Sequence, residues 1–560
     1  MSRELTRQLL LRLPFALLVT AACVLYIRWP CAGLNADSAT FGIMGNDLLR
    51  RGYLPTLTYG QDYLFSITPY LYALVRWLAP AGLTPERALA IAGCLLAVGG
   101  LWLAFESLLS VQRRTGRPLF AAALVFGAVV AASPSYVMDL AETSSVELSL
   151  FLLGALMFGA ARIEAARARG AAGCGGWFLL GAVIAHAVSS RPQTLLYAVV
   201  VVPALLLSAR RRSVGQARDL RPLWAFAGGA ALGCLPMLCH WLFRAAAWPF
   251  AYHVPVHFGT LSHIRRAAAL LMREILPRIV SLDPAYPVHS VVVVATILAA
   301  LGGYAWFWRR GRTQMSALDH AWLLGSVLSI AVMILYPKLA VAVGNRRYCL
   351  HVLLAVAWLA ARFAVPARGA PLYACAGAAA LALAVLPAWP GWLAGARAAD
   401  EQVLAARPGI IPELARLDRL VLADYWDAYP LAFLADGHLR VECLPWQMVR
   451  TYGRYSPAEM TNAVWLVREG RGQSTLAALT AELGPQALAA IRSVPLQHAL
   501  FGRPAELWML QEGAAVELMN RHHPRYFTTP YPPGSRLPAA FAAGRTRRDR
   551  PQTAPPEAAP

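Results

Sequence analysis

Long apolar runs separated by short polar segments occupy most of the first 389 residues. A helix needs about 20 predominantly apolar residues to cross a hydrocarbon layer roughly 30 Å thick. This pattern predicts a mainly α-helical, polytopic transmembrane bundle of about eleven spans. The runs lie near residues 13–27, 88–110, 118–133, 145–161, 175–190, 194–208, 221–243, 288–308, 318–336, 348–364 and 371–388.

Arginine gathers in alternate loops between these runs, as it does on the cytoplasmic side of membrane proteins. The loops are marked by Arg113, Arg114 and Arg117, by Arg167 and Arg169, by Arg210 to Arg212, by Arg309, Arg310 and Arg312, and by Arg362 and Arg368. The alternation predicts a multi-pass protein of the cytoplasmic (inner) membrane with a cytoplasmic N-terminus. The segment beyond residue 390 is then external, or periplasmic.

The amino-acid composition is that of an integral membrane protein, and this affects how the positive net charge of the chain is interpreted. Hydrophobic residues make up 58% of the chain and charged residues 14%, against about 25% charged in soluble domains. The net charge of +21 comes largely from these short loops. We therefore interpret it as a topology signal and expect membrane lipids, not nucleic acid, as partners.

Three parts of the chain are expected. Residues 1–389 form the transmembrane domain, whose first external loop, 28–87, carries candidate chemistry. Residues 390–525 form a small external α/β domain, and the Pro- and Arg-rich residues 526–560 form a disordered tail.

Two external surface helices are predicted within the loops. In the first loop, Phe41, Met44 and Leu48 recur at helical spacing, and Gly52 ends the segment. The second external segment, 244–287, contains a similar helix over 264–275. We expect both to lie along the membrane surface.

The C-terminal domain alternates short strand-like and helical patterns. Strands are predicted at 420–422 and 464–467, and a helix at 426–435 that ends at Asp436 and Gly437. A hairpin is predicted from 494–500 and 505–510 around the turn at 501–503.

Asp37 is the first carboxylate after the first span, on the predicted external side. A membrane enzyme acting on a lipid-linked substrate would place a general base there. The alternative is structural, because Asn35 or Asp37 at a helix start can cap the unpaired N–H groups.

A longer pattern resembles the C-type membrane glycosyltransferases, which include protein O-mannosyltransferases and the enzyme that adds aminoarabinose to lipid A. The first external loop carries most of the resemblance, and weaker similarities occur late in the bundle and in the C-terminal domain. The segments are 35–39, 49–53 and 59–63, then 336–338 with 346–348, and 423–429.

This resemblance implies a hexosyl- or pentosyltransferase of the cell envelope that uses a polyprenyl-phosphate sugar donor, with Asp37 as the general base. Many members have two adjacent acids, whereas Ser38 follows Asp37 here. The missing carboxylate weakens a metal-dependent or dual-acid scheme. No cofactor is assigned from the sequence, and a divalent cation stays an open alternative.

Inverting sugar transfer needs a base for the acceptor hydroxyl and cations for the departing phosphate. Arg346, Lys338 and Arg191 lie in predicted external loops, and Tyr348 neighbours the first of them. The alternative for each cation is a side chain that reaches lipid headgroups from a helix end.

Other polar residues could contact the sugar or hold a cation, with helix capping as the alternative for the two loop acids near residue 140. They are Asp139, Glu142, Gln61 and Asp62. His253, His257 and His263 lack the spacing of a metal pair on one helix face, which favours structural or interfacial histidines.

The sequence thus favours an inverting membrane glycosyltransferase that transfers sugar from a polyprenyl-phosphate donor to a lipid, glycan or protein acceptor at the external face. A transporter or flippase of lipid-linked saccharide is the first alternative. It would be expected to show repeats, broken helices and charges near the membrane midplane. A non-catalytic membrane scaffold is the second.

Overall fold

The computed structural model describes most of the helices and the C-terminal sheet. The described residues are 3–52, 66–79, 82–131, 146–191, 193–210, 220–244, 260–279, 287–310, 315–335, 349–364, 375–380, 387, 389–444, 459, 462–484, 491–511, 514 and 518.

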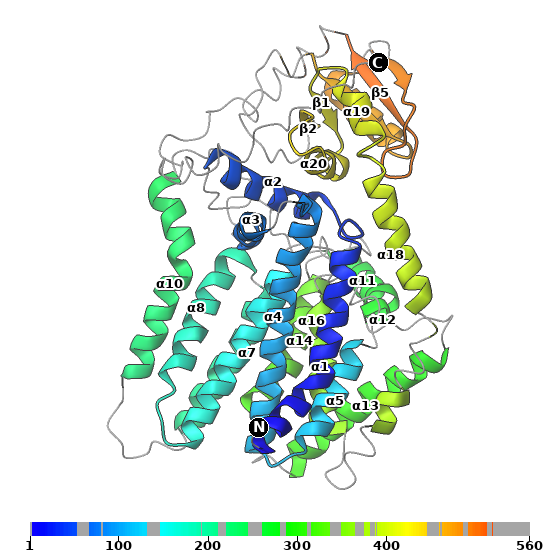
Figure 1. Cartoon of the computed structure of the whole chain (residues 1–560). Coiled ribbons are helices and arrows are strands. Elements are labelled where there is room, and N and C mark those ends of the chain that lie inside the picture. The colour runs from blue at the N-terminus through cyan, green and yellow to red at the C-terminus, as the bar shows by residue number, and fades with distance from the viewer. Residues whose placement is uncertain are drawn as a thin grey trace, which may run out of the picture.

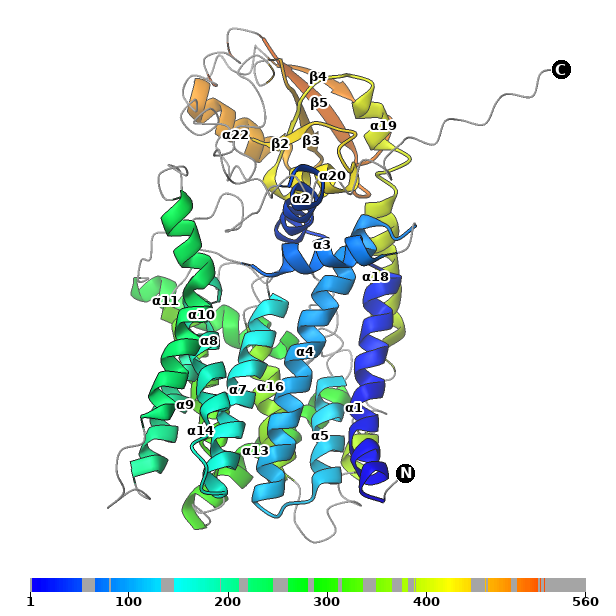
Figure 2. The same cartoon turned by 60° about the vertical axis from the view of Figure 1, so that its left-hand side comes forward.

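Long apolar helices run side by side and form the bundle (Figures 1 and 2). They are α1 (Arg3–Arg28), α4 (Pro85–Arg114), α5 (Leu119–Ala131), α7 (Val146–Ala168), α8 (Cys174–Ser190), α9 (Gln193–Arg210), α10 (Arg221–Arg244), α13 (Pro287–Arg310), α14 (Ala317–Leu335), and α16 (Leu350–Leu359) with its π-helical continuation η4 (Ala360–Ala364). Every predicted span except the last falls on one of these helices. The last, 371–388, lies mostly outside the described residues, of which 375–380 are helical.

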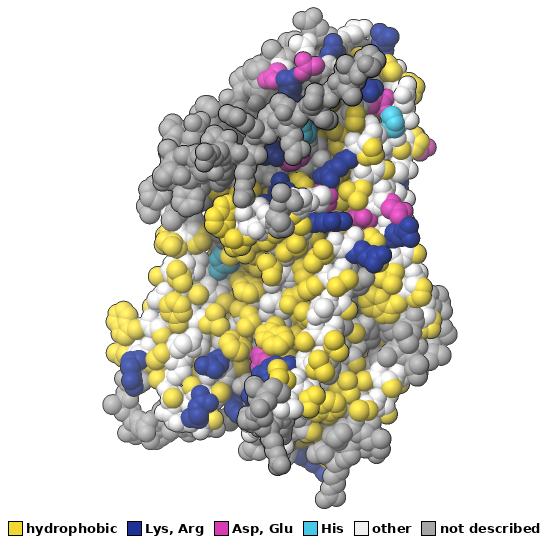
Figure 3. Space-filling model, viewed as in Figure 1, with side chains coloured by type: hydrophobic (Ala, Val, Ile, Leu, Met, Phe, Trp, Pro, Cys, Tyr) yellow, Lys and Arg dark blue, Asp and Glu magenta, His cyan; other side chains and the backbone are white. Residues whose placement is uncertain are grey.

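Among the described residues, 4 helices are long and apolar enough to cross a membrane, and several shorter apolar helices accompany them. The predicted count of about eleven spans is therefore not confirmed. The face of the bundle that Figure 3 shows is broadly apolar. On α13, Val291 is 68% and Leu298 63% exposed, as expected of side chains that face lipid.

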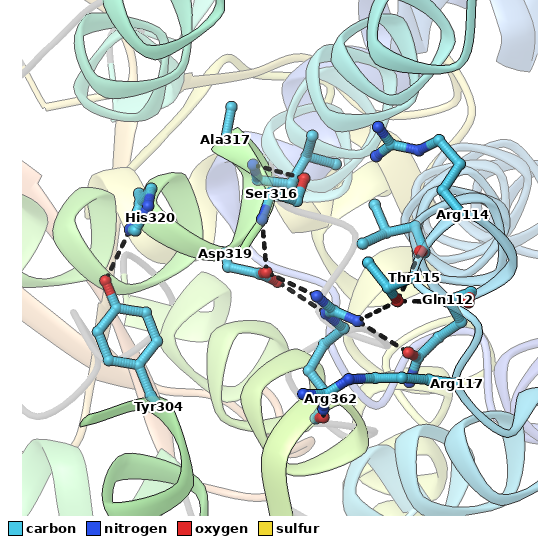
Figure 4. Close-up of polar contacts among 12 residues, drawn as sticks. Gln112, Arg114, Thr115, Arg117, Tyr304, Ser316, Ala317, Asp319, His320 and Arg362 are labelled. Carbon is cyan, nitrogen blue, oxygen red and sulfur yellow. Dashed lines mark hydrogen bonds and ion pairs between the residues drawn. The ribbon is translucent and has the colours of Figure 1, made fainter. Parts of the chain in front are cut away.

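Buried polar contacts connect the last turn of α4 to α14 and η4 (Figure 4). α4 ends on the side of the bundle that lies away from the C-terminal sheet (Figures 1 and 2). The guanidinium of Arg362 donates to both carboxylate oxygens of Asp319, at 2.9 and 2.8 Å, and to Gln112 and Thr115. The side chains of Arg362 and Asp319 are both fully buried. The sequence analysis expected Arg362 in a cytoplasmic loop. It lies instead on η4, where its hydrogen bonds connect η4 to α4 and α14 in the interior of the bundle.

Two short helices lie across the other end of the bundle, α2 (Ala36–Arg51) and α3 (Thr68–Leu78) (Figures 1 and 2). The helix predicted in the first loop is α2, and Gly52 ends it in the left-handed conformation with φ 64°. Its residues Phe41 and Met44 are each 1% exposed. The apolar face of α2 therefore packs against protein, where the sequence suggested a membrane surface.

The second predicted surface helix is also present. It is formed by α11 (Leu261–Leu270), the π-helical turn η1 (Leu271–Ile275) and α12 (Leu276–Ile279).

The C-terminal segment forms a mixed five-stranded sheet with helices. Its elements are α18 (Trp389–Leu404), α19 (Ile410–Ala415), β1 (Val421–Ala423), α20 (Tyr425–Leu434), β2 (Val441–Cys443), β3 (Val464–Arg468), α22 (Gly472–Leu483), β4 (Ile491–Pro495) and β5 (Ala505–Leu510). The strand order is β2-β1-β3-β5-β4. β1 is parallel to β2 and β3, whereas β5 is antiparallel to β3 and β4. The predicted helix and the predicted strands at 420–422 and 464–467 are confirmed by α20, β1 and β3. The predicted hairpin is present as β4 and β5, but its first strand is Ile491–Pro495 where 494–500 was expected, and β2 was missed.

The C-terminal sheet shares one hydrophobic core with the first loop. Phe41 of α2, Tyr72 of α3 and Leu89 of α4 belong to the same buried cluster as Val421 of β1 and Phe433 of α20. Residues from the two ends of the chain thus form a single packed layer on the end of the bundle.

Candidate functional site

The start of α2 is capped without the carboxylate of Asp37. The side-chain oxygen of Asn35 accepts hydrogen bonds from the backbone N–H groups of Asp37 and Ser38, at 2.9 and 3.1 Å. In return, the Ser38 hydroxyl accepts from the backbone N–H of Asn35 at 2.9 Å. This reciprocal capping box assigns the cap to Asn35. It also gives Ser38 a structural role at the position where many C-type enzymes have a second acid.

The carboxylate of Asp37 bonds to the C-terminal domain. The Tyr425 hydroxyl donates a hydrogen bond of 2.9 Å to Oδ1 of Asp37, across 388 residues of sequence. Tyr425 is 8% exposed, and Asp37 is half-buried. A partly buried carboxylate that accepts a hydrogen bond from a phenol, between the bundle and the C-terminal sheet, is a suitable place for proton transfer to or from a substrate.

The position of Tyr425 follows from how α20 begins. Asp424 caps the helix by accepting from the backbone N–H of Trp426 at 3.1 Å. The ring of Tyr425 packs edge-on against Trp426 and Tyr429, with centroids 5.1 and 5.4 Å apart. Tyr429 is held in turn, since its hydroxyl donates to the buried carboxylate of Glu442 at 2.7 Å.

α2 and α20 run parallel and are joined at both ends. Asp37 and Tyr425 meet at their first turns. At their far ends, Arg50 pairs with Asp436 at 2.8 Å, and Asn46 donates to the same carboxylate at 3.3 Å. The side chain that faces Asp37 is therefore set by the pairing of the two helices.

Further contacts fix the C-terminal segment to the bundle. Arg407 donates two hydrogen bonds to Glu86 at the start of α4, at 2.9 and 2.7 Å. Asp400 of α18 accepts from the backbone N–H of Cys31 at 2.7 Å. The C-terminal segment is thus bonded to the turn that follows α1 and to α4, as well as to α2.

One carboxyl group of α20, that of Asp427, has a pKa above its usual range. Burial raises the pKa of Asp427 to about 6, although the Arg468 guanidinium, 3.2 Å away, opposes the shift. The carboxylate that pairs with Arg468 is therefore only about half ionised near pH 6, and its charge is lost as the pH falls below this value.

Arg191 is the second predicted site residue that the structure describes. It follows α8 at the end of the bundle nearer to α2 and is 8% exposed. A side chain that reaches lipid headgroups would be more exposed than this. The burial fits better with a contact inside the protein or to a substrate.

The other predicted site residues lie outside the described part of the chain. They are Arg346, Lys338, Tyr348, Asp139, Glu142, Gln61 and Asp62, and the histidines His253 and His257 lie outside it as well. Within the described ranges, no three or more His, Cys, Asp or Glu side chains are grouped so that they could hold a metal ion.

No protein-family model matches the chain, and no curated protein matches it. Solved structures of ArnT from Cupriavidus metallidurans share its fold. The structure bound to undecaprenyl phosphate matches with a TM-score of 0.54 at 12% identity, covering 88% of this chain and 97% of that chain. The apo structure gives a TM-score of 0.54 at 12% identity, covering 90% and 98%. The resemblance to the C-type membrane glycosyltransferases, to which ArnT belongs, is thus confirmed at the level of the fold.

Proposed function

We propose that this chain, which has the fold of ArnT, is a membrane glycosyltransferase that moves a sugar from a polyprenyl-phosphate donor to an acceptor at the outer face of the cytoplasmic membrane. The observation that carries the proposal is the match over 88% of the chain to a structure bound to undecaprenyl phosphate. A match over 88% of the chain extends over most of the bundle and at least part of the C-terminal domain.

The reaction we propose is an inverting displacement. The acceptor hydroxyl attacks the anomeric carbon of the sugar while the bond from that carbon to the phosphate oxygen breaks. Asp37 takes the hydroxyl proton, and polyprenyl phosphate leaves with the bonding electrons. A phosphate leaving group needs nearby positive charge more than it needs an acid.

We assign that positive charge to Arg191, Lys338 and Arg346. The burial of Arg191 supports a role in binding the phosphate, because a desolvated guanidinium binds phosphate more strongly than an exposed one. We assign contacts with the sugar or acceptor to the remaining predicted residues, Tyr348, Asp139, Glu142, Gln61 and Asp62.

The placement of buried charges favours an enzyme over a transporter. A transporter is expected to hold ionisable residues near the middle of its helices. In the described part of the bundle, buried charged side chains stand at helix ends: Glu86, Glu147, Arg191, Asp319 and Arg362.

Deletion of the protein tests this function without knowledge of the sugar. Membranes from deletion cells should accumulate one polyprenyl-phosphate sugar, identified by mass spectrometry of the lipid extract. Purified protein added to those detergent-solubilised membranes should consume that lipid and release polyprenyl phosphate. Unchanged lipid-linked sugars in the deletion cells, together with no release in vitro, would reject the proposal. Accumulation without release in vitro would point to the transporter.

A further inference from the structure

We infer that Tyr425 is a positioning residue of the active site, so that the C-terminal domain completes the catalytic centre. The inference rests on the proposed function, because it acts through Asp37. It adds a residue from the C-terminal domain to a site otherwise assigned to the bundle and the loops between its helices.

The hydrogen bond between Tyr425 and Asp37 restricts the orientation of the proposed base. A phenol hydroxyl 2.9 Å from Oδ1 fixes the rotation of the Asp37 carboxylate. A general base must keep its oxygen within about 2.6 to 3.2 Å of the proton that it takes, so loss of this restraint should slow the chemical step.

Tyr425 is itself immobilised, as a positioning residue must be. Its ring is 8% exposed and packs against Trp426 and Tyr429. Tyr429 is fixed by Glu442, which is 1% exposed and also accepts from the backbone N–H of Cys443 at 2.8 Å. Each support lies on an element of the C-terminal sheet or its helix, so the restraint on Asp37 comes from a rigid frame.

The alternative is that the hydrogen bond only fastens the domain to the bundle. α2 and α20 share a second polar contact, in which Arg50 pairs with Asp436 at 2.8 Å. A fastening role predicts that loss of either contact has a similar effect. A positioning role predicts that only loss of the Tyr425 hydroxyl slows the reaction.

The test compares purified Tyr425→Phe, Arg50→Ala and Tyr304→Phe with wild type. The substrate is the solubilised membrane lipid of deletion cells, and released polyprenyl phosphate is measured. Tyr425→Phe should lower kcat about ten- to a hundredfold and leave affinity for undecaprenyl phosphate unchanged. Arg50→Ala controls for the fastening, and Tyr304→Phe controls for loss of a tyrosine hydroxyl that is hydrogen-bonded elsewhere, to His320 in the bundle. Both should keep kcat within about twofold.

A double variant separates action through Asp37 from independent action. Residues that act as a unit have non-additive effects, so adding Tyr425→Phe to Asp37→Asn should cause no further loss in single-turnover assays. If Asp37→Asn is inactive but Tyr425→Phe keeps wild-type kcat, or lowers kcat only as much as Arg50→Ala does, the inference is wrong and the proposed function stands. If Asp37→Asn itself turns over normally, the proposed base is wrong.

Discussion

Gly42 of α2 lies against the ring of Phe433 of α20, with no space between them for a side chain. A Cβ built on Gly42 would overlap three atoms of that ring. Phe433 is fully buried, so its ring has little room to move aside. The close approach of α2 and α20, which brings Asp37 to Tyr425, therefore depends on a glycine at this position.

We expect Gly42→Ala to destabilise the protein by about 1 to 3 kcal/mol and to lower turnover, because the added methyl separates the two helices. Thermal unfolding in detergent and polyprenyl phosphate release measure the two effects. Gly302→Ala in α13 is the matched control, since nothing lies within 4 Å of its Cβ position. Equal stability of both variants would contradict the packing account. Gly42→Ala combined with Phe433→Leu should recover part of the loss.

Asp319→Asn should reduce stability without changing the chemistry of the enzyme that remains folded. Removing one charge of a fully buried pair leaves Arg362 uncompensated and costs about 3 to 5 kcal/mol. Because this pair lies beside the end of α4 that is opposite to α2 (Figures 1 and 2), kcat per folded molecule should equal that of wild type. A selective loss of kcat in stable Asp319→Asn protein would show coupling between the two ends.

Arg191→Ala should weaken binding of undecaprenyl phosphate by roughly ten- to a hundredfold, as expected for loss of a charge-assisted contact to phosphate in a partly dry site. Arg162→Ala is a suitable control, because Arg162 is exposed on α7 near the opposite end of the bundle. Titration of the lipid into purified protein gives both affinities. If the two variants bind alike, the phosphate site does not include Arg191.

The predicted topology places the C-terminal layer and the Arg-rich loops on opposite sides of the membrane. Ser474 of α22 and Ala171, between α7 and α8, are both exposed. With an impermeant thiol reagent applied from outside, Ser474→Cys should be labelled above the level of the unmodified chain, and Ala171→Cys should not. The reverse pattern would put Asp37 on the cytoplasmic side and contradict the proposed reaction site.

Local pattern was sufficient to predict α2 and the C-terminal hairpin. α2 has apolar residues at helical spacing and a glycine that adopts φ 64° after its last turn. The hairpin turns through Phe501 and Gly502, both of which have positive φ. These signals arise within a few residues of each other, so the sequence displays them directly.

Features that depend on distant residues were not predictable in this way. β2 has three residues with Glu442 at its centre, and that charge argues against a buried strand until Tyr429 is seen to bond to it. The sequence also left Asn35 and Asp37 as equal candidates for the helix cap. Only the folded chain assigns the cap to Asn35 and shows Tyr425 at the carboxylate of Asp37.

The most direct test of the account is the turnover of purified Asp37→Asn protein with the polyprenyl-phosphate sugar from deletion membranes. The substitution keeps the shape of the side chain and can still accept the hydrogen bond from Tyr425, while Asn35 keeps the cap of α2. We therefore predict wild-type thermal stability and wild-type binding of undecaprenyl phosphate, with polyprenyl phosphate release reduced about a hundredfold or more. Release at the wild-type rate from this stable variant would show that Asp37 is not the base.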